Sequence, residues 1–372
     1  MRARHRIRTE RGFRLCLTPA VYQLRSPLNT AVSAVVLRAS SGHQGTAFFI
    51  FRHMRPPYTK PHLSFADQVD LLINRGLGVT DRTKAIHHLQ RIGYGRLAPY
   101  WEPFEQNGPD PRDPSRIIRT DQFRPGAEFR HAVDLYLFDK QLRLLFLDAI
   151  ERIEVALRVD LAHTLGKRDP WAHLSPAFLD TRRANTPFHD GTRHQNWLDK
   201  ANQSIRRSKE SWVKQFFDTY SSPLPIWMAV ETWDFGTLSW LLFMAHPRDR
   251  FAIASRYGLL PDTLVSWIRC LAFVRNICAH HSRLWNSPII NQPNVPKEQE
   301  APTVVHIGTE VVRRTRVYGA AAVASCLVKE ISAGTSWSRR MKAHWIDFPT
   351  MPLARASQGG FTAPWDTLEI WT

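Results

Sequence analysis

Apolar residues recur at steps of three and four along most of the chain, which is the period of an amphipathic helix. The clearest segment runs from Ala127 to Leu165 without a glycine or a proline. It predicts one continuous buried stripe, formed by Phe138, Leu142, Leu145, Ala149, Ile153, Ala156 and Leu161. No alternation of period two is sustained, so the pattern predicts an all-helical protein.

Further helices are predicted before and after this segment. Ser64 followed by Asp67 is a capping signal at the start of the first one. Residues 94–104 are rich in aromatic side chains and are interrupted by two prolines. The remaining predicted helices cover Thr80 to Ile92, about 195–218, 225–245, Pro261 into the 270s, and about 309–346.

This pattern divides the chain into four parts. Residues 1–53 are a basic N-terminal extension, 54–127 an N-terminal helical segment, 128–290 the helical core, and 291–372 a C-terminal helical segment and tail. The extension holds nine arginines and one acidic residue, Glu10. We expect it to be disordered, or to precede a natural start at Met54, where the character of the sequence changes.

Composition and charge favour a folded protein with a polyanionic partner. Of the 372 residues, 43% are hydrophobic, and the formal net charge is +17. A net charge of this size points to nucleic acid. A genome rich in G and C would also raise the arginine content, and composition alone leaves both explanations open. No apolar run approaches the ~18 residues of a membrane span, so no membrane contact is expected.

Four cysteines in a chain of this length do not form a disulfide framework. Cys270 and Cys278 fall in an apolar helical stretch and are expected to be small core residues in the reducing cytoplasm. Together with His280 and His281 they also raise the question of a metal site. The spacing lacks a CxxC pair or an HExxH motif, so no metal and no cofactor is expected.

The most informative stretch is LVSWIRCLAFVRNICAHHSRLWN, residues 264–286. At ~100° per residue, its apolar residues form a core stripe on one side of a helix. Arg275 falls in the middle of that stripe, whereas Asn276 and His280 are four residues apart and share another side. Either a carboxylate meets Arg275, or the stripe faces a cleft. The helix must end or distort near residues 279–281, or a second copy of the chain must complete the site.

These three residue types can cleave RNA. A histidine with a pKa near neutrality can transfer a proton to or from the 2′-hydroxyl or the leaving oxygen. Arg275 can bind the phosphate in a bidentate manner, and Asn276 can orient His280. An ordinary helix end with cationic residues near its C-terminus is the plainer explanation of the same pattern.

Two further groups are candidates for supporting roles. The first group lies on the long predicted helix and comprises Glu151, Glu154 and Arg158. These residues form a solvated face in which Glu154 and Arg158 make an i,i+4 ion pair, or one of the two carboxylates is the partner of Arg275. Arg96, Tyr100 and Trp101 combine a cation with aromatic rings on which RNA bases can stack, packing in the core being the alternative.

Several blocks of the chain, in this order, resemble the Abi-like (abortive infection) family of bacterial phage-defence proteins, part of the HEPN superfamily. The resemblance extends over nearly all of 54–372. It rests on LLINRGLGV (71–79), IGYGRLAPYWEPF (92–104), DLYLFDKQLRLLFLDAIERIEVALR (134–158), PIWMAVETWDFGTLS (225–239), RNICAHHSRLWN (275–286) and FTAPWDTLEIW (361–371).

The resemblance implies a HEPN-type helical bundle with additional N- and C-terminal helices. It implies a homodimer whose two motifs share a cleft, and metal-independent endoribonuclease activity in phage defence or as a toxin. The catalytic signature of the superfamily maps onto Arg275, Asn276 and His280. RNA is then the expected partner, and an antitoxin protein or a small RNA is a further candidate. A protein of this type that binds RNA or another protein without cutting is the alternative.

Overall fold

The computed structural model of the chain describes residues 20–25, 31–36, 49–51, 59, 61–111 and 113–372. The chain forms two compact units, Met1–Leu63 and Ser64–Thr372. In the first unit an antiparallel sheet has the strand order β1 (Ala20–Arg25), β2 (Ala31–Val36), β3 (Phe49–Phe51). The sequence pattern did not predict this sheet. The other residues of the predicted N-terminal extension (1–53) lie outside the described residues. Their disorder therefore stays a prediction.

The second unit is mainly helical, which confirms the predicted fold class. All α-helices of the described residues lie in it: α1 (Phe65–Asn74), α2 (Arg82–Arg91), α3 (Tyr94–Trp101), α4 (Phe129–Gly166), α5 (Thr181–Ala184), α6 (Arg193–Arg207), α7 (Ser211–Thr219), α8 (Ile226–Ala229), α9 (Phe235–Met244), α10 (Pro247–Ser255), α11 (Pro261–Ala279), α12 (Val311–Thr315), α13 (Val317–Ile331) and α14 (Trp337–Ile346). None of the described helices is long and apolar enough to cross a membrane.

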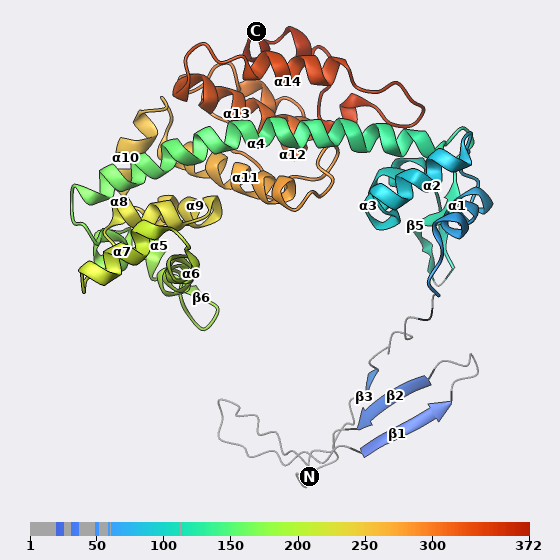
Figure 1. Cartoon of the computed structure of the whole chain (residues 1–372), viewed down its shortest axis with the longest axis horizontal. Coiled ribbons are helices and arrows are strands. Elements are labelled where there is room, and N and C mark those ends of the chain that lie inside the picture. Colours follow the sequence, from blue (N-terminus) through green and yellow to red (C-terminus); the bar gives the residue numbers. More distant parts are fainter. Residues whose placement is uncertain (1–19, 26–30, 37–48, 52–58, 60, 112) are drawn as a thin grey trace. The chain divides into compact units, whose positions relative to one another are not determined.

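Helix α4, with 38 residues, is the axis of this unit. Figure 1 shows it spanning the unit, with α13 and α14 along one side and α9 and α11 along the other, and it contacts all four. Most of the predicted stripe is buried; only Leu145 and Ala156 are partly exposed. The run from Ala127 to Leu165, which has no glycine or proline and is apolar at helical spacing, explains why one uninterrupted helix forms.

Side-chain caps decide where several helices begin. The predicted capping signal of α1 is confirmed, because the Ser64 hydroxyl accepts from the Asp67 amide (3.2 Å) and the Asp67 carboxylate accepts from the Ser64 amide (3.2 Å). The helix expected within 225–245 is divided into α8 and α9. The Asp234 carboxylate accepts from the Thr237 amide (2.6 Å) and so starts a new helix at Phe235.

The sequence pattern did not predict the strands of residues 105–123. Strands β4 (Glu105–Asp110) and β5 (Asp113–Phe123) pair antiparallel, and the very short β6 (Pro187–Phe188) and β7 (Gly191–Thr192) form another pair. Most of β5 is exposed, so it carries no apolar alternation for a pattern to detect. Its end is instead held by tertiary contacts: Phe123 is buried, and its amide donates to the Arg75 carbonyl (2.8 Å).

Candidate functional site

The motif residues lie at the C-terminal end of α11. The helix ends at Ala279, and His280 is its C-cap. His281 then adopts a left-handed conformation with φ 55° and donates its amide to the Cys278 carbonyl, while the Ser282 amide donates to the Ile277 carbonyl. These two bonds form a Schellman motif, which satisfies the last carbonyls of the helix and turns the chain sharply. The helix therefore ends near residues 279–281, which was one of the alternatives that the sequence left open.

Exposure separates the motif from the core stripe beside it. Asn276 and His280 are exposed and Arg275 is half-buried. The apolar residues of the predicted stripe are buried, as expected: Trp267, Ile268, Leu271, Val274 and Cys278. Within the part of the chain that the structure describes, no hydrogen bond or ion pair involves the side chains of Arg275, Asn276 and His280. All three are free to meet a ligand.

The structure brings Asn276 and His280 together but not Arg275. The first two are one helical turn apart on one side of α11, and the His280 amide donates to the Asn276 carbonyl (3.0 Å). Arg275 precedes His280 by five residues, which on a helix places them about 140° apart. Arg275 emerges where the stripe reaches the exposed helix end, since Ala279, four residues on, is exposed. A guanidinium at that position needs no carboxylate partner.

A buried carboxylate holds the turn that follows the motif. Asp139 of α4 is 0% exposed. Its Oδ1 accepts from the Trp285 amide (2.7 Å), and its Oδ2 accepts from the Leu284 amide (2.9 Å). Oδ2 also accepts from the Tyr100 hydroxyl (2.6 Å) and from Arg143 Nη1 (2.5 Å). These contacts join α3, α4 and the chain after α11 at one point.

The charges of this network compensate one another. Burial raises the pKa of Asp139, and the Arg143 guanidinium, the Tyr100 hydroxyl and the two amides oppose that rise. Burial and the Asp139 charge raise the pKa of Tyr100, which therefore remains a hydrogen-bond donor around neutral pH. Arg143 Nη1 also donates to the Ser282 carbonyl (3.3 Å). A buried ion pair with this many hydrogen bonds fixes the geometry of the turn.

The three residues expected to bind RNA bases lie on α3, and two of them serve the core. Tyr100 and Trp101 are each 1% exposed, so neither ring offers a face to a base, and core packing was the correct alternative. Arg96 is exposed, and its Nη1 donates to the His281 carbonyl (2.9 Å). Arg96 and Tyr100 thus support the turn from outside and inside.

Glu154 and Glu151, the carboxylates considered as partners of Arg275, do not contact it. Glu154 and Arg158 form the predicted i,i+4 ion pair, and Arg158 also donates to the Val230 and Trp233 carbonyls. That pair clamps α4 to the segment between α8 and α9. The Glu151 side chain is exposed and forms no ion pair in the described part of the chain. Neither glutamate meets Arg275.

Sequence reasoning missed Asp139 and Arg143, although a signal was present. Each directly follows a position of the predicted stripe, Phe138 and Leu142, and the two are four residues apart. An acid and a base at i,i+4 beside a buried stripe predict a pair at the edge of the core. The partners of Asp139 that lie 145 and 146 residues away could not be predicted from that spacing.

The large cavity beside α11 lies away from the motif residues. A cavity of about 670 Å³ opens at the other end of α11, where Arg183, Asp262, Lys297 and Arg314 are among its lining residues, and no motif residue lines it. Burial raises the pKa of Cys278 to about 12, so its thiol is not ionised near neutral pH. In the described residues, no three histidine, cysteine or acidic side chains group in a way that could hold a metal ion.

Comparison with known proteins places these residues in a family. A family model described as Abi-like protein matches residues 87–286, a narrower range than the expected 54–372. The matched range contains Arg275, Asn276 and His280 as well as the Asp139–Arg143 pair. The search of curated proteins and the search of solved structures give no match. Because the match covers more than half of its length, the chain belongs to the Abi-like protein family.

Proposed function

We propose that this protein is a metal-independent endoribonuclease of the HEPN type that acts as an abortive-infection effector. Membership of the Abi-like family supports the abortive-infection role. One observation carries the enzymatic part of the proposal. Arg275, Asn276 and His280 form no hydrogen bond or ion pair with the described residues through their side chains, yet the turn beside them is held by the buried Asp139. Free polar groups on a rigid support are typical of a catalytic site.

The proposed reaction needs only the RNA and these side chains. The 2′-oxygen attacks the adjacent phosphorus and loses its proton to a base, while the bond from phosphorus to the 5′-oxygen breaks and that oxygen takes up a proton. The products are a 2′,3′-cyclic phosphate and a 5′-hydroxyl. His280 transfers one of the protons, and Asn276, one turn before it, orients the imidazole. Arg275 stabilises the charge on the phosphate.

Arg275 and His280 diverge on α11, so a second copy of the chain would bring them to the same phosphate. In a two-fold arrangement of the helix ends, Arg275 of one copy faces His280 of the other. The cavity at the opposite end of α11 is remote from this arrangement and takes no part in it.

A cleavage assay with EDTA present tests this proposal. Wild-type protein should cut single-stranded RNA and leave 2′,3′-cyclic phosphate ends. His280→Ala and Arg275→Ala should each reduce the rate by ~10²-fold or more, the usual scale for a proton-transferring group and for a charge-stabilising donor. Arg275→Lys should also fail largely, since an ammonium does not reproduce the planar fork of donors.

His281→Asn is the matched control. Asparagine tolerates the left-handed conformation at this position, and the backbone carbonyl that Arg96 holds is retained. Cleavage by this variant should stay within about threefold of wild type, the range left when no catalytic group is lost. Loss of activity in His281→Asn but not in His280→Ala would move the site by one residue. Inhibition by EDTA would contradict the metal-independent mechanism.

The second candidate is a protein of the same family that binds RNA without cutting it. The exposure of Asn276 and His280 favours this candidate as much as it favours the enzyme. Wild-type protein that binds RNA but leaves it intact, with binding unaffected by His280→Ala, would establish the binding protein and exclude the nuclease.

A further inference from the structure

The exposed side of α11 continues from the motif towards the start of the helix. Arg269, Phe273, Asn276 and His280 follow one another at steps of four, three and four, which places them on one line along the helix. Each is partly or fully exposed, while the helix positions Cys270, Ala272, Val274 and Cys278 are buried. Asn276 and His280 therefore share a solvent-facing strip with Arg269, about 16 Å further along the axis at 1.5 Å per residue.

Arg269 belongs to a cluster of cations and aromatic rings. Its guanidinium carbon lies 4.8 Å from the ring centroid of Trp240 and 5.6 Å from that of Phe243, both on α9. The guanidinium carbon of Arg193, at the start of α6, lies 5.6 Å and 5.1 Å from the same two centroids. We call these four residues the arginine–aromatic cluster. All four side chains are partly exposed.

Among the described residues, the two guanidiniums of the cluster have no carboxylate partner. Arg193 Nη1 donates to the backbone carbonyl of Arg183 (3.0 Å), its Nε is buried without a partner, and no ion pair in the described residues involves Arg193 or Arg269. Burial and the nearby charge of Arg193 lower the pKa of Arg269. Two like charges held at the same rings repel each other, and an anion between them would remove that repulsion.

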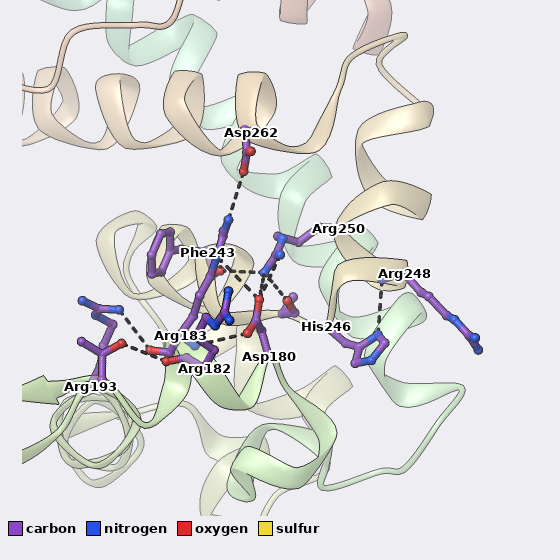
Figure 2. Close-up of polar contacts among 11 residues, drawn as sticks. Asp180, Arg182, Arg183, Arg193, Phe243, His246, Arg248, Arg250 and Asp262 are labelled. Atoms are coloured by element: carbon purple, nitrogen blue, oxygen red, sulfur yellow. Dashed lines mark hydrogen bonds and ion pairs between the residues drawn. The ribbon is translucent and has the colours of Figure 1, made fainter.

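The neighbouring arginine shows the contrast. Arg183 also lies beside Phe243, with its guanidinium carbon 4.7 Å from the ring centroid, but it forms ion pairs with both Asp180 and Asp262. Figure 2 shows its side chain extending past Phe243 towards Asp262. The buried arginines of the described chain are likewise paired: Arg143 with Asp139, Arg250 with Asp180 and Arg313 with Glu310. Among the described arginines that lie beside Phe243, Arg183 is therefore neutralised by carboxylates, whereas Arg193 and Arg269 are not.

We infer that the arginine–aromatic cluster binds single-stranded RNA, with a phosphate between Arg193 and Arg269, on the strand whose scissile bond lies at His280. This inference rests on the proposed function for the position of the cut. Unpaired cations bind phosphate, and the aromatic side chains there, including Phe188 at 6.3 Å from Trp240, offer surfaces for unstacked bases. A ligand that reaches both sites must cover about 16 Å along the helix and is therefore an oligonucleotide.

The test measures binding apart from cleavage, in the full chain carrying His280→Ala. Fluorescence anisotropy with a labelled single-stranded RNA of about twelve nucleotides reports Kd over a range of salt concentrations. Adding Arg193→Ala and Arg269→Ala should raise Kd at least about tenfold, as expected for loss of charge-assisted hydrogen bonds. The slope of log Kd against log salt should fall by about 0.7, the value for one phosphate of a single strand.

The control removes the same charge elsewhere on α6. Arg206 and Arg207 are exposed and lie in the last turn of that helix. Changing both to alanine should alter Kd by less than about threefold, since general surface charge acts weakly. Equal losses in the two double variants would overturn the inference, and so would unchanged binding after loss of Arg193 and Arg269.

Stability and ligand choice supply two further readouts. Since Arg193 and Arg269 repel each other, Arg269→Gln should not lower Tm, and a lowered Tm together with unchanged Kd would show a structural role only. Duplex DNA that binds equally well, with the same dependence on the cluster, would replace the RNA assignment by a general polyanion surface. If wild type binds through the cluster but never cuts, the proposed nuclease fails and the binding site stands. If the wild-type protein cuts RNA and its RNA binding does not depend on the cluster, the proposed nuclease stands and only the proposed binding site is refuted.

Discussion

At the scale of single residues, Asp139 has more partners than any motif residue. Replacing it by alanine leaves the buried Arg143 without its carboxylate and the Leu284 and Trp285 amides without an acceptor. We expect Asp139→Ala to lower the free energy of unfolding by about 3–5 kcal/mol, the usual cost of removing one partner of a buried pair. Urea denaturation measures this. Glu151→Ala, on the exposed side of the same helix, should stay within about 0.5 kcal/mol of wild type. A loss below about 1 kcal/mol for Asp139→Ala would show that the network is dispensable for stability.

The candidate site was predictable from the sequence only in part. Arg275 stood out because it is charged within an apolar helical stripe, and Asn276 and His280 because they share another side of the helix. An end or distortion of the helix near residues 279–281 was one of two alternatives that the sequence left open. The buried roles of Tyr100 and Asp139 depend on contacts between α3, α4 and the turn after α11, which no local spacing encodes. The arginine–aromatic cluster joins α6, α9 and α11 and was missed for the same reason.

At the scale of elements, length and periodicity decided what could be predicted. Helix α4 was predicted to within two residues at its start because its stripe repeats over many turns. The division between α8 and α9 was missed because Asp234 interrupts a strongly apolar run by a single side-chain cap. The β4–β5 pair was missed because it is pinned at Arg75 and Phe123 by tertiary contacts and otherwise lies open to solvent.

Packing between helices also predicts a pH dependence of stability. His344 of α14 stacks on Phe138 of α4 with ring centroids 4.0 Å apart, and burial lowers its pKa to about 4. Burial also lowers the pKa of His173 and that of His306 to about 4. Between these values and the ~6.5 of an unfolded histidine, the unfolded chain binds protons that the folded chain does not. The free energy of unfolding should therefore fall as pH drops from 6.5 to 4.

A single substitution isolates one histidine of this set. His344→Phe keeps a ring against Phe138 and removes the titrating group. Between pH 6.5 and 4, the slope of unfolding free energy against pH should decrease by up to the contribution of one bound proton. The reason is that this histidine no longer takes up a proton on unfolding. Urea denaturation at a series of pH values gives the slope. An unchanged slope would show that His344 is protonated in the folded protein.

At the scale of the whole molecule, the division into two compact units predicts that the helical unit folds without residues 1–53. Ser64–Thr372 contains the candidate site and all described helices. A chain starting at Met54 should therefore melt within about two degrees of the full chain. In a protein of this size, a Tm shift of about two degrees corresponds to a change in unfolding free energy of less than about 1 kcal/mol. Differential scanning calorimetry provides the comparison. A larger decrease in Tm would mean that residues 1–53 pack against the helical unit.

The divergence of Arg275 and His280 on α11 leads to a prediction about assembly. Light scattering should show a dimer at micromolar concentration, and the composite site can be tested by mixing two inactive proteins. A dimer of one Arg275→Ala chain and one His280→Ala chain keeps an intact Arg275 and an intact His280 on opposite copies. If the site is shared across the two-fold axis, random pairing should restore about a quarter of wild-type cleavage, since half the dimers are mixed and each retains one of two complete sites. If both residues act within one copy, the mixture stays as inactive as its components. A monomer that cuts RNA would contradict the shared site directly.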